Sequence, residues 1–407
     1  KRGHPISRTL ILRRQSFTHQ SDRNRWSVEQ TDCCCDCVEN IAGIMSGTME
    51  QREISAPRVG RFKVYIQGDL KNCQFIILTV HDLGCNHSMW ANFMSHMSME
   101  EIIRRGAFIH VDVPGQDDEA TALPADYTFP SMQSLGEDLV CVLDQLDVKT
   151  VIAIGEGAGA NIVARFAMAQ PDRVNGVVLI HCTGTTAGFM ESMKDKLIEW
   201  KLEQIGMNPT AEAYLCLHRF GSASNEFEKA LNKEQLQKVI ESFQQSLRSK
   251  VNPHNLRLYV HSYMKRSNIA DQIGKVRCPI LMVTGTKSSF NDSVHSLFNK
   301  MREVLDKKQV DYLEVDGVAN VLEEKPDRFA ESFLYFLQGL GLVGGVPMPR
   351  VQRSASIEGS SGQIPGRTRS MSMEEADLPR GTWSMSPPKF GGSKISGSPP
   401  SSSPTKS

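Results

Sequence analysis

The sequence predicts an α/β protein in which a doubly wound, mostly parallel sheet carries a helical cap insertion. Short apolar runs alternate with stretches of helical periodicity, a pattern typical of parallel sheets that are covered by helices on both faces. The alternation stops at residues 185–272, which contain long amphipathic segments and indicate the cap. We expect an N-terminal extension at residues 1–50, the α/β domain at residues 51–343 and a tail at residues 344–407.

Each expected strand is an apolar run bounded by turn residues. Residues 60–69 alternate between apolar and polar side chains, which predicts a strand with one solvated face. Residues 74–80 and 174–182 are apolar almost throughout, as in strands that are buried on both faces. The expected strands lie at residues 60–69, 74–80, within 102–116, and at 151–154, 174–182, 278–286 and 310–315.

The expected helices place apolar residues three and four positions apart. Residues 129–148 carry a stripe of leucine and valine side chains, and Ser131 is a suitable N-cap before them. The amphipathic stretches 225–247 and 252–267 are assigned to the cap. Further helices are expected from residue 158, at 292–305 and at 328–343.

Residues 151–167, with the sequence VIAIGEGAGANIVARFA, predict a strand, a sharp turn and a helix. In α/β-hydrolases such a turn is the nucleophile elbow, G-x-S-x-G, in which the serine stands on a strained backbone. Gly157 takes the place of that serine. Glycine adopts the strained conformation at little cost, whereas other residues lose about 1–3 kcal/mol there.

The histidine that a hydrolase triad requires is also missing. It should follow the last expected strand, where Ala319 and Asn320 stand. The last histidine of the chain is His295, so no histidine follows that strand. Without this general base, a serine nucleophile could not be activated.

The triad acid is expected after the strand at residues 278–286, near Ser288. The nearest acidic residue is Asp292, several positions further on, and the alternative acid position holds Thr183-Gly184-Thr185. Because all three members are replaced, the sequence predicts a protein without Ser-His-Asp catalysis. The vestigial triad positions are Gly157, Ser288 and Asn320.

Four other residues can face the former pocket: His81, Asp82, Cys85 and Glu156. One interpretation is an atypical hydrolase with a non-serine nucleophile such as Cys85. Another is a small-molecule sensor that retains the pocket, and a third is a partner-binding surface. In the structural alternative, His81 and Asp82 hydrogen-bond their own loop and the cysteine fills space in the core.

The N-terminal extension contains Cys33, Cys34, Cys35 and Cys37. Adjacent cysteines near basic residues suit reversible palmitoylation and hence peripheral membrane association. Metal binding is an alternative, although the cluster lacks a second ligand pair of the usual spacing. A solvated terminus without either role is the third interpretation.

The tail is rich in Ser, Pro, Gly and Arg and almost free of aromatic residues, so it is expected to be disordered. Its serines follow arginines in patterns that basophilic Ser/Thr kinases recognise. Phosphate at such a site adds about −1.5 to −2 charges and can create or mask a docking patch. The candidate phosphorylation sites are Ser354, Ser356, Ser370 and Ser372.

Composition and charge exclude several classes of protein function. The formal net charge is zero, which gives no overall field for nucleic acid binding. No apolar run reaches the roughly 18 residues of a membrane span, and no secretory signal is recognisable. The scattered cysteines suit a reducing compartment. We therefore expect a cytoplasmic protein, without a cofactor or a metal centre.

Six segments carry a resemblance to a known family: HDLGCNHSMWANF (81–93), HVDVPGQ (110–116), FPSMQSL (129–135), IGEGAGANIVARFA (154–167), NLRLYVHSYMKR (255–266) and FLYFLQGLG (333–341). In this order they resemble the N-myc downstream-regulated (NDRG) family, over about residues 50–343. The resemblance implies an α/β-hydrolase-like fold without hydrolase activity. It also implies protein partners in signalling, stress response, differentiation or vesicle trafficking, with tail phosphorylation at Ser356 and Ser372.

Overall fold

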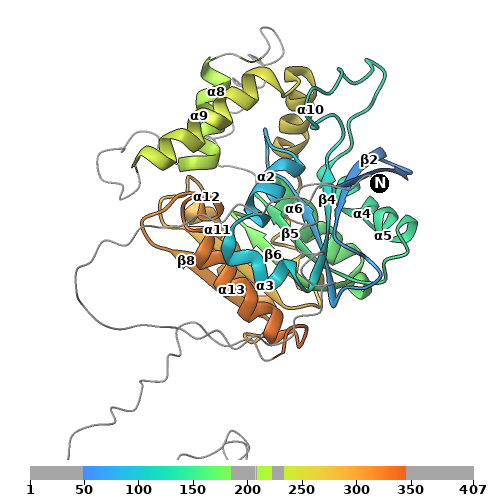
Figure 1. Cartoon of the computed structure of the whole chain (residues 1–407), viewed down its shortest axis with the longest axis vertical. Helices are drawn as coiled ribbons and strands as arrows, with labels where there is room; N and C mark the ends of the chain where they lie inside the picture. The colour runs from blue at the N-terminus through green and yellow to red at the C-terminus, as the bar shows by residue number, and fades with distance from the viewer. Residues whose placement is uncertain (1–48, 185–206, 208, 222–232, 345–407) are drawn as a thin grey trace, which may run out of the picture. The chain divides into compact units, whose positions relative to one another are not determined.

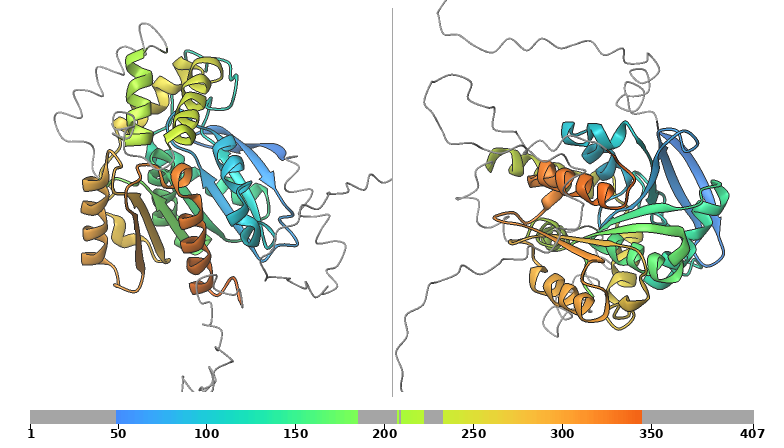
Figure 2. Two further views of the ribbon diagram at one scale, coloured as in Figure 1. Left: turned by 60° about the vertical axis from the view of Figure 1, so that its left-hand side comes forward. Right: turned by 90° about the horizontal axis from the view of Figure 1, so that it is seen from below.

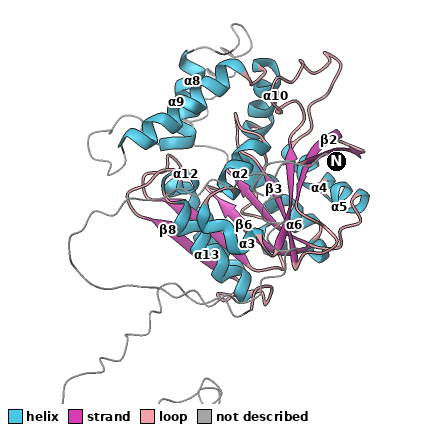
Figure 3. Ribbon diagram, in the orientation of Figure 1, coloured by secondary structure: helices cyan, strands magenta, loops and turns pink. Residues whose placement is uncertain are grey.

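The structure is a computed structural model that describes residues 49–184, 207, 209–221 and 233–344. Eight strands form one sheet in the order β1-β2-β4-β3-β5-β6-β7-β8 (Figures 1 and 3). β2 is antiparallel to both of its neighbours, and all other adjacent pairs are parallel. The strands are β1 (Glu50–Ala56), β2 (Gly60–Gln67), β3 (Phe75–Val80), β4 (Gly106–Asp112), β5 (Val151–Glu156), β6 (Val174–Ile180), β7 (Ile280–Gly285) and β8 (Val310–Val315).

The central strands are buried on both faces because two hydrophobic clusters cover the sheet. One cluster joins the sheet to α4 (Met132–Asp138), α5 (Val140–Gln145), α6 (Ala158–Ala169) and α11 (Asn291–Val304). β5 and β6 contribute side chains to both clusters, in the alternation expected of a strand. This arrangement explains why their sequences are apolar almost throughout.

The second cluster lies on the opposite face, so that α13 and α11 flank the sheet from two sides (Figure 2). Its aromatic residues include Trp90, Phe93, Phe329 and Phe333, all of them buried. The helices concerned are α2 (His87–Met94), α3 (Glu100–Ile103), α12 (Val321–Glu324) and α13 (Pro326–Gly339), and single 3₁₀ turns lie at η1 (Met97–Met99), η2 (Pro171–Arg173) and η5 (Ile273–Lys275).

Three described helices form the cap between β6 and β7: α8 (Pro209–Phe220), α9 (Lys233–Ser249) and α10 (Pro253–Met264). They lie together at one end of the sheet (Figures 1 and 2). Asn252 caps α10 by accepting the backbone N–H groups of His254 and Asn255. No helix within the described residues is both long and apolar enough to cross a membrane.

The predicted strands are all present, and the α/β architecture with a helical insertion is confirmed. The strand predicted at residues 151–154 continues to Glu156. The predicted helix at residues 129–148 consists of α4 and α5, which meet at Leu139, and the Ser131 hydroxyl caps α4 by accepting the Ser134 N–H at 3.1 Å.

β1 is missing from the sequence prediction. It is an edge strand in which five of the seven residues are exposed, so it has no alternating apolar pattern to reveal it. It forms an antiparallel hairpin with β2, from the pair Ala56 and Gly60 to the pair Glu50 and Ile66. Since this pairing depends on backbone hydrogen bonds, a polar sequence is sufficient for it.

Candidate functional site

The elbow has the backbone geometry of its hydrolase counterpart. Gly157 lies between β5 and α6 with φ of 53° and ψ of −110°, a conformation that favours glycine. Its neighbours Gly155 and Gly159 are also constrained, because a Cβ on Gly155 would overlap the α6 backbone and one on Gly159 would overlap the Val80 carbonyl. The glycines of this turn thus let strand, helix and neighbouring strand approach closely.

The Asp82 carboxylate occupies the space next to Gly157. It accepts a hydrogen bond from the Ala158 backbone N–H at 2.8 Å, and a Cβ at position 157 would overlap it. In α/β-hydrolases the N–H after the nucleophile is an oxyanion-hole donor. The Asp82 carboxylate therefore occupies the space of the nucleophile. It also binds one of the N–H donors that stabilise the negatively charged oxyanion in a hydrolase.

His218 of the cap helix α8 closes over this carboxylate. Its Nε2 lies 3.0 Å from Asp82 Oδ2 and 3.3 Å from Oδ1, and both residues are buried. Burial opposes both charges, but their attraction outweighs it: the pKa of Asp82 is lowered and the pKa of His218 is raised. The pair is thus a buried ion pair between the cap and the loop after β3.

The next residue of α8 enters a second network. Arg219 Nη1 donates to Glu156 Oε2 and its Nη2 donates to Glu323 Oε1, each at 2.7 Å. Asn320 Nδ2 donates to Glu156 Oε1 at 2.6 Å, while Asn320 Oδ1 caps α12 by accepting the Glu323 N–H at 3.1 Å. The amide at the expected position of the catalytic histidine therefore binds the carboxylate at the end of β5.

The expected acid position contributes to neither network. Ser288 lies in the turn after β7, where its N–H donates to the Gly285 carbonyl at 3.0 Å. Asp292, the nearest acid in sequence, lies in the first turn of α11. The structure thus brings Gly157 and Asn320 close to the two networks but leaves Ser288 outside them.

His81 has a structural environment. It is fully buried, its Nδ1 lies 2.8 Å from the Asp82 carbonyl, and its Nε2 accepts the Val113 N–H at 3.1 Å. Burial lowers the pKa of His81, so the neutral ring donates through Nδ1 and accepts through Nε2. The expectation that His81 and Asp82 bond their own loop fits this geometry, because the Asp82 carbonyl also accepts the Cys85 N–H at 3.2 Å. The Asp82 carboxylate in addition reaches the cap.

Cys85 lies near the same networks, but its environment does not activate a thiol. Its side chain is buried, and burial raises the pKa of Cys85 well above its ordinary value. Glu156 is likewise buried and holds Arg219 and Asn320. Both residues are therefore buried close to Arg219 and Asp82 rather than on an open pocket.

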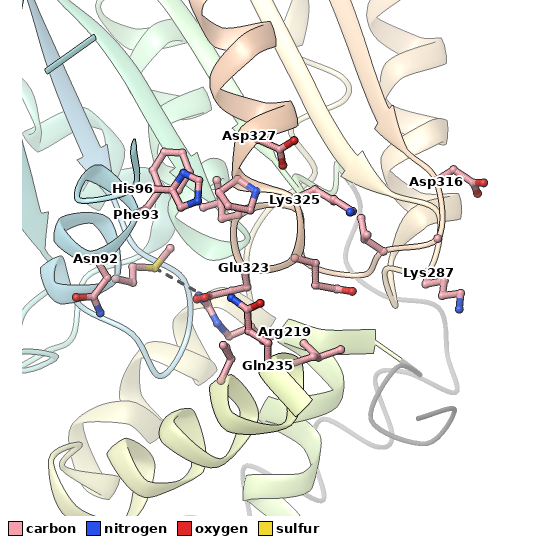
Figure 4. Close-up of a pocket in the computed structure, with 18 residues that line it drawn as sticks. Asn92, Phe93, His96, Arg219, Gln235, Lys287, Asp316, Glu323, Lys325 and Asp327 are labelled. Carbon is pink, nitrogen blue, oxygen red and sulfur yellow. Dashed lines mark hydrogen bonds and ion pairs between the residues drawn. The ribbon is translucent and has the colours of Figure 1, made fainter. Parts of the chain in front are cut away.

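An open cavity of about 650 Å³ lies beside the filled centre (Figure 4). Arg219 and Glu323 form part of its wall. Residues of α2, α9, α12 and the start of α13 also line it, together with the turns that follow β7 and β8. Gly157, Asp82 and His218 are not part of its described lining. Its lining combines charged side chains (Lys287, Asp316, Glu324, Lys325 and Asp327) with apolar ones (Met89, Phe93, Leu236, Val239, Val318 and Leu322).

The sequence does not single out His218 or Arg219. They are two consecutive polar residues of an amphipathic helix, and nothing in that pattern shows that both point into the protein. The cysteine cluster Cys33, Cys34, Cys35 and Cys37 and the tail serines Ser354, Ser356, Ser370 and Ser372 lie outside the described residues. Within the described parts, no three His, Cys, Asp or Glu side chains cluster as metal ligands do.

Solved structures share the fold. An esterase from Thermogutta terrifontis superposes with a TM-score of 0.58 at 15% identity, covering 72% of this chain and 99% of the esterase. An enol-lactonase from Burkholderia xenovorans superposes with a TM-score of 0.55 at 15% identity, covering 68% of this chain and 96% of the lactonase. The chain therefore has the α/β-hydrolase fold.

Sequence relatives cover more of the chain. An uncharacterized protein of Caenorhabditis elegans is 38% identical over 331 residues, which are 80% of this chain and 92% of the relative. Human protein NDRG2 is 32% identical over 358 residues, 86% of this chain and 91% of the relative. Residues 52–344 match the model of the Ndr family. The chain therefore belongs to the Ndr family.

Proposed function

We propose that this chain is a non-catalytic protein of the α/β-hydrolase fold that acts by binding protein partners in the cytoplasm. The observation that carries the proposal is the carboxylate of Asp82, which fills the nucleophile's space and is held there by His218. The processes in which it would act are those that the resemblance to the NDRG family implies: signalling, stress response, differentiation or vesicle trafficking.

Two physical arguments support the absence of catalysis. A nucleophile must stand beside an oxyanion donor and reach the substrate carbonyl, but the Ala158 N–H already serves the Asp82 carboxylate. The second argument is access, because Asp82, His218 and Glu156 are all more than nine-tenths buried. A substrate would have to displace α8 and break both buried networks.

The test is hydrolysis of 4-nitrophenyl acetate and 4-nitrophenyl butyrate by the full chain. We expect no turnover above the protein-free rate. A matched pair of variants, Cys85→Ala and Cys141→Ala, identifies the alternative: a measurable rate that only Cys85→Ala abolishes would establish an atypical hydrolase and overturn the proposal. A rate that both variants retain would also contradict it, with a nucleophile other than Cys85.

The cavity of about 650 Å³ supports a second candidate, a small-molecule sensor. Its volume falls within the roughly 300–1,000 Å³ of ligand sites, and it combines apolar walls with charged groups. A thermal-shift screen tests this candidate with two variants. Val239→Trp changes the cavity wall, and Val304→Trp is the control at a residue of α11 that is 46% exposed. A ligand whose stabilisation is lost only in Val239→Trp would favour sensing, and a screen without such a ligand would reject it.

Control by tail phosphorylation is part of the proposal. It rests on the arginine-flanked serines Ser354, Ser356, Ser370 and Ser372. A basophilic kinase should phosphorylate Ser356 and Ser372 in the purified chain, and proximity labelling in cells should differ between the wild type and a Ser356→Ala/Ser372→Ala variant. Identical labelling of the two would remove the phosphorylation switch and leave the scaffold role.

Peripheral membrane association is proposed on the cysteine cluster alone. Changing Cys33, Cys34, Cys35 and Cys37 to serine should move the chain from the membrane fraction to the supernatant. Changing Cys73 and Cys141, which are partly buried in the α/β domain, is the control. Unchanged partitioning of the first variant would exclude the lipid anchor.

A further inference from the structure

A second cavity, of about 510 Å³, lies between the segment at residues 129–133 and the C-terminal part of α10. It shares no described lining residue with the cavity beside the former catalytic centre. Among its described lining residues there is no aspartate or glutamate. The polar side chains are those of Ser131, Gln133, His261, Ser262, Lys265, Arg266 and Ser267, and the apolar ones are those of Phe129, Pro130, Met132 and Leu258.

A buried arginine lies directly behind this wall. Arg165 of α6 is 1% exposed, and its guanidinium donates to Gln133 Oε1 at 2.6 Å and to Ser267 Oγ at 3.0 Å. It also donates to the Ser267 carbonyl at 2.6 Å and to Asn161 Oδ1 at 2.9 Å. All these partners are neutral groups: two side-chain amides, one hydroxyl and one backbone carbonyl.

The positive charge of Arg165 therefore has no carboxylate among the hydrogen-bond partners of its side chain. Burial, and then the neighbouring Arg266, lower the pKa of Arg165 to about 10, so the side chain is still charged at neutral pH. The nearest acid along α4 is Glu137, which accepts from Gln133 Nε2 at 2.8 Å but forms its ion pair with Arg58. A buried cation usually has an anionic partner, and this one hydrogen-bonds Gln133 and Ser267, two residues that line the cavity.

Arg266 is fixed in the cavity wall. Its Nη2 donates to Thr183 Oγ1 and its Nη1 donates to the Tyr263 carbonyl, both at 2.8 Å. Its guanidinium also stacks 3.8 Å from the centroid of the Tyr263 ring. Lys265, by contrast, is exposed at the rim and can turn toward a ligand. A fixed guanidinium and a movable ammonium on one cavity are well suited to an anion.

We propose that this cavity is a binding site for an organic phosphate monoester. Its phosphate would contact Lys265 and the hydroxyls of the rim, in the field of Arg165 and Arg266, and its apolar part would lie against Met132 and Leu258. A soluble phosphomonoester and the phosphate of a lipid head group share this chemistry. The site is independent of the proposed non-catalytic function, because it contains none of the vestigial triad positions.

Calorimetric titration of the full chain with phenyl phosphate tests the site, with phenol as the uncharged control. We expect saturable binding of phenyl phosphate only, which weakens as the salt concentration rises. Lys265→Glu should weaken binding by about tenfold or more. The control is Lys307→Glu, at an exposed lysine between α11 and β8. It should change the affinity by less than about twofold, because salt screens a distant surface charge.

Two further measurements locate the site and distinguish the sources of phosphate. The ¹³C-methyl resonance of Met132, assigned with Met132→Leu, should shift when phenyl phosphate binds. Sedimentation with phosphatidylcholine vesicles that contain phosphatidic acid tests the lipid source, with pure phosphatidylcholine vesicles as the control. Binding of phenyl phosphate alone assigns a soluble ligand, and binding of the acidic vesicles alone, if Lys265→Glu abolishes it, assigns a head group.

Three results would overturn the proposal. The first is that neither phenyl phosphate nor the acidic vesicles bind more strongly than the uncharged controls. The second is binding that Lys265→Glu and Lys307→Glu weaken equally, which would indicate only a diffuse surface charge. The third is binding of phenyl phosphate that leaves the Met132 methyl resonance unmoved, which would place the ligand elsewhere on the protein.

Discussion

Asp82 and His218 are 136 residues apart in the chain, yet His218 Nε2 lies 3.0 Å from Asp82 Oδ2. The carboxylate that makes this contact also accepts the Ala158 N–H and borders Gly157. One buried ion pair thus joins the cap helix α8, the loop after β3 and the elbow. Because these three segments surround a hydrolase active site, the pair stabilises the fold at the place where catalysis would require open space.

Restoring a serine at the elbow should destabilise the protein rather than activate it. In Gly157→Ser, the side chain meets the Asp82 carboxylate and the backbone keeps a positive φ. Backbone strain and overpacking each cost about 1–3 kcal/mol, so we expect a loss of about 4 kcal/mol. Urea unfolding monitored by circular dichroism measures this loss.

A second glycine separates the two causes of that loss. Gly341 has a similar φ of 72°, but no atom lies within 4 Å of an added Cβ. Gly341→Ser should therefore cost only the strain, about 1–2 kcal/mol. Asp82→Ala should also reduce the penalty of Gly157→Ser in a double-mutant cycle. Equal losses in Gly157→Ser and Gly341→Ser would refute the overlap with Asp82.

The ion pair of His218 should make stability depend on pH in a defined direction. The pKa of His218 is raised above its ordinary 6.5, so its contribution is complete below about pH 6.5 and is lost as pH rises through the folded-state value. The pKa of Asp82 is lowered, so its contribution is lost only as pH falls below its ordinary 3.8. The pair should stabilise the fold most between these limits.

His218→Gln tests this dependence because glutamine retains a hydrogen-bond donor but cannot be protonated. The difference in unfolding free energy between the wild type and His218→Gln should be largest near pH 5.5. Above pH 6.5 it should shrink, by at most about 1.4 kcal/mol per pH unit for a single proton. His254→Gln, at an exposed position of α10, is the control. A difference that stays constant from pH 5 to 9 would show that His218 is uncharged.

Removing Arg219 should leave the Glu156 carboxylate buried without its cation. Breaking a buried pair by removing one partner costs about 3–5 kcal/mol, and we expect this loss in Arg219→Gln. The control is Arg104→Gln, because Arg104 pairs with Glu101 at an exposed site and such pairs contribute about 0–1 kcal/mol. If both variants lose less than 1 kcal/mol, Arg219 does not tie the cap to the sheet.

The thiols should differ in reactivity according to burial. Cys85 and Cys182 are buried, and burial raises the pKa of Cys182 to about 12. Cys73 and Cys141 are only partly buried. In brief alkylation with iodoacetamide followed by peptide mass spectrometry, Cys85 and Cys182 should react at least about tenfold more slowly. Labelling of Cys85 at the rate of Cys73 would revive its role as a nucleophile.

Local patterns explain which elements could be predicted. The strand at residues 310–315 was expected at the residues that form β8, because an apolar run between turn signals is a property of the segment itself. The elbow was equally predictable, since a sharp turn between a strand and a helix needs closely spaced glycines. β1 was not predictable, because an exposed edge strand is specified by its pairing with β2 rather than by its own composition.

The sequence by itself determined that the elbow carries Gly157 and that no histidine follows β8, because identity and order are local facts. Only the tertiary structure decided what fills the space that these residues vacate. The loop before α2 supplies Asp82 and the cap supplies His218 and Arg219, and their meeting depends on how α8 packs on the sheet. Burial and ion pairing are properties of that packing, so no periodicity or motif of the chain could reveal them.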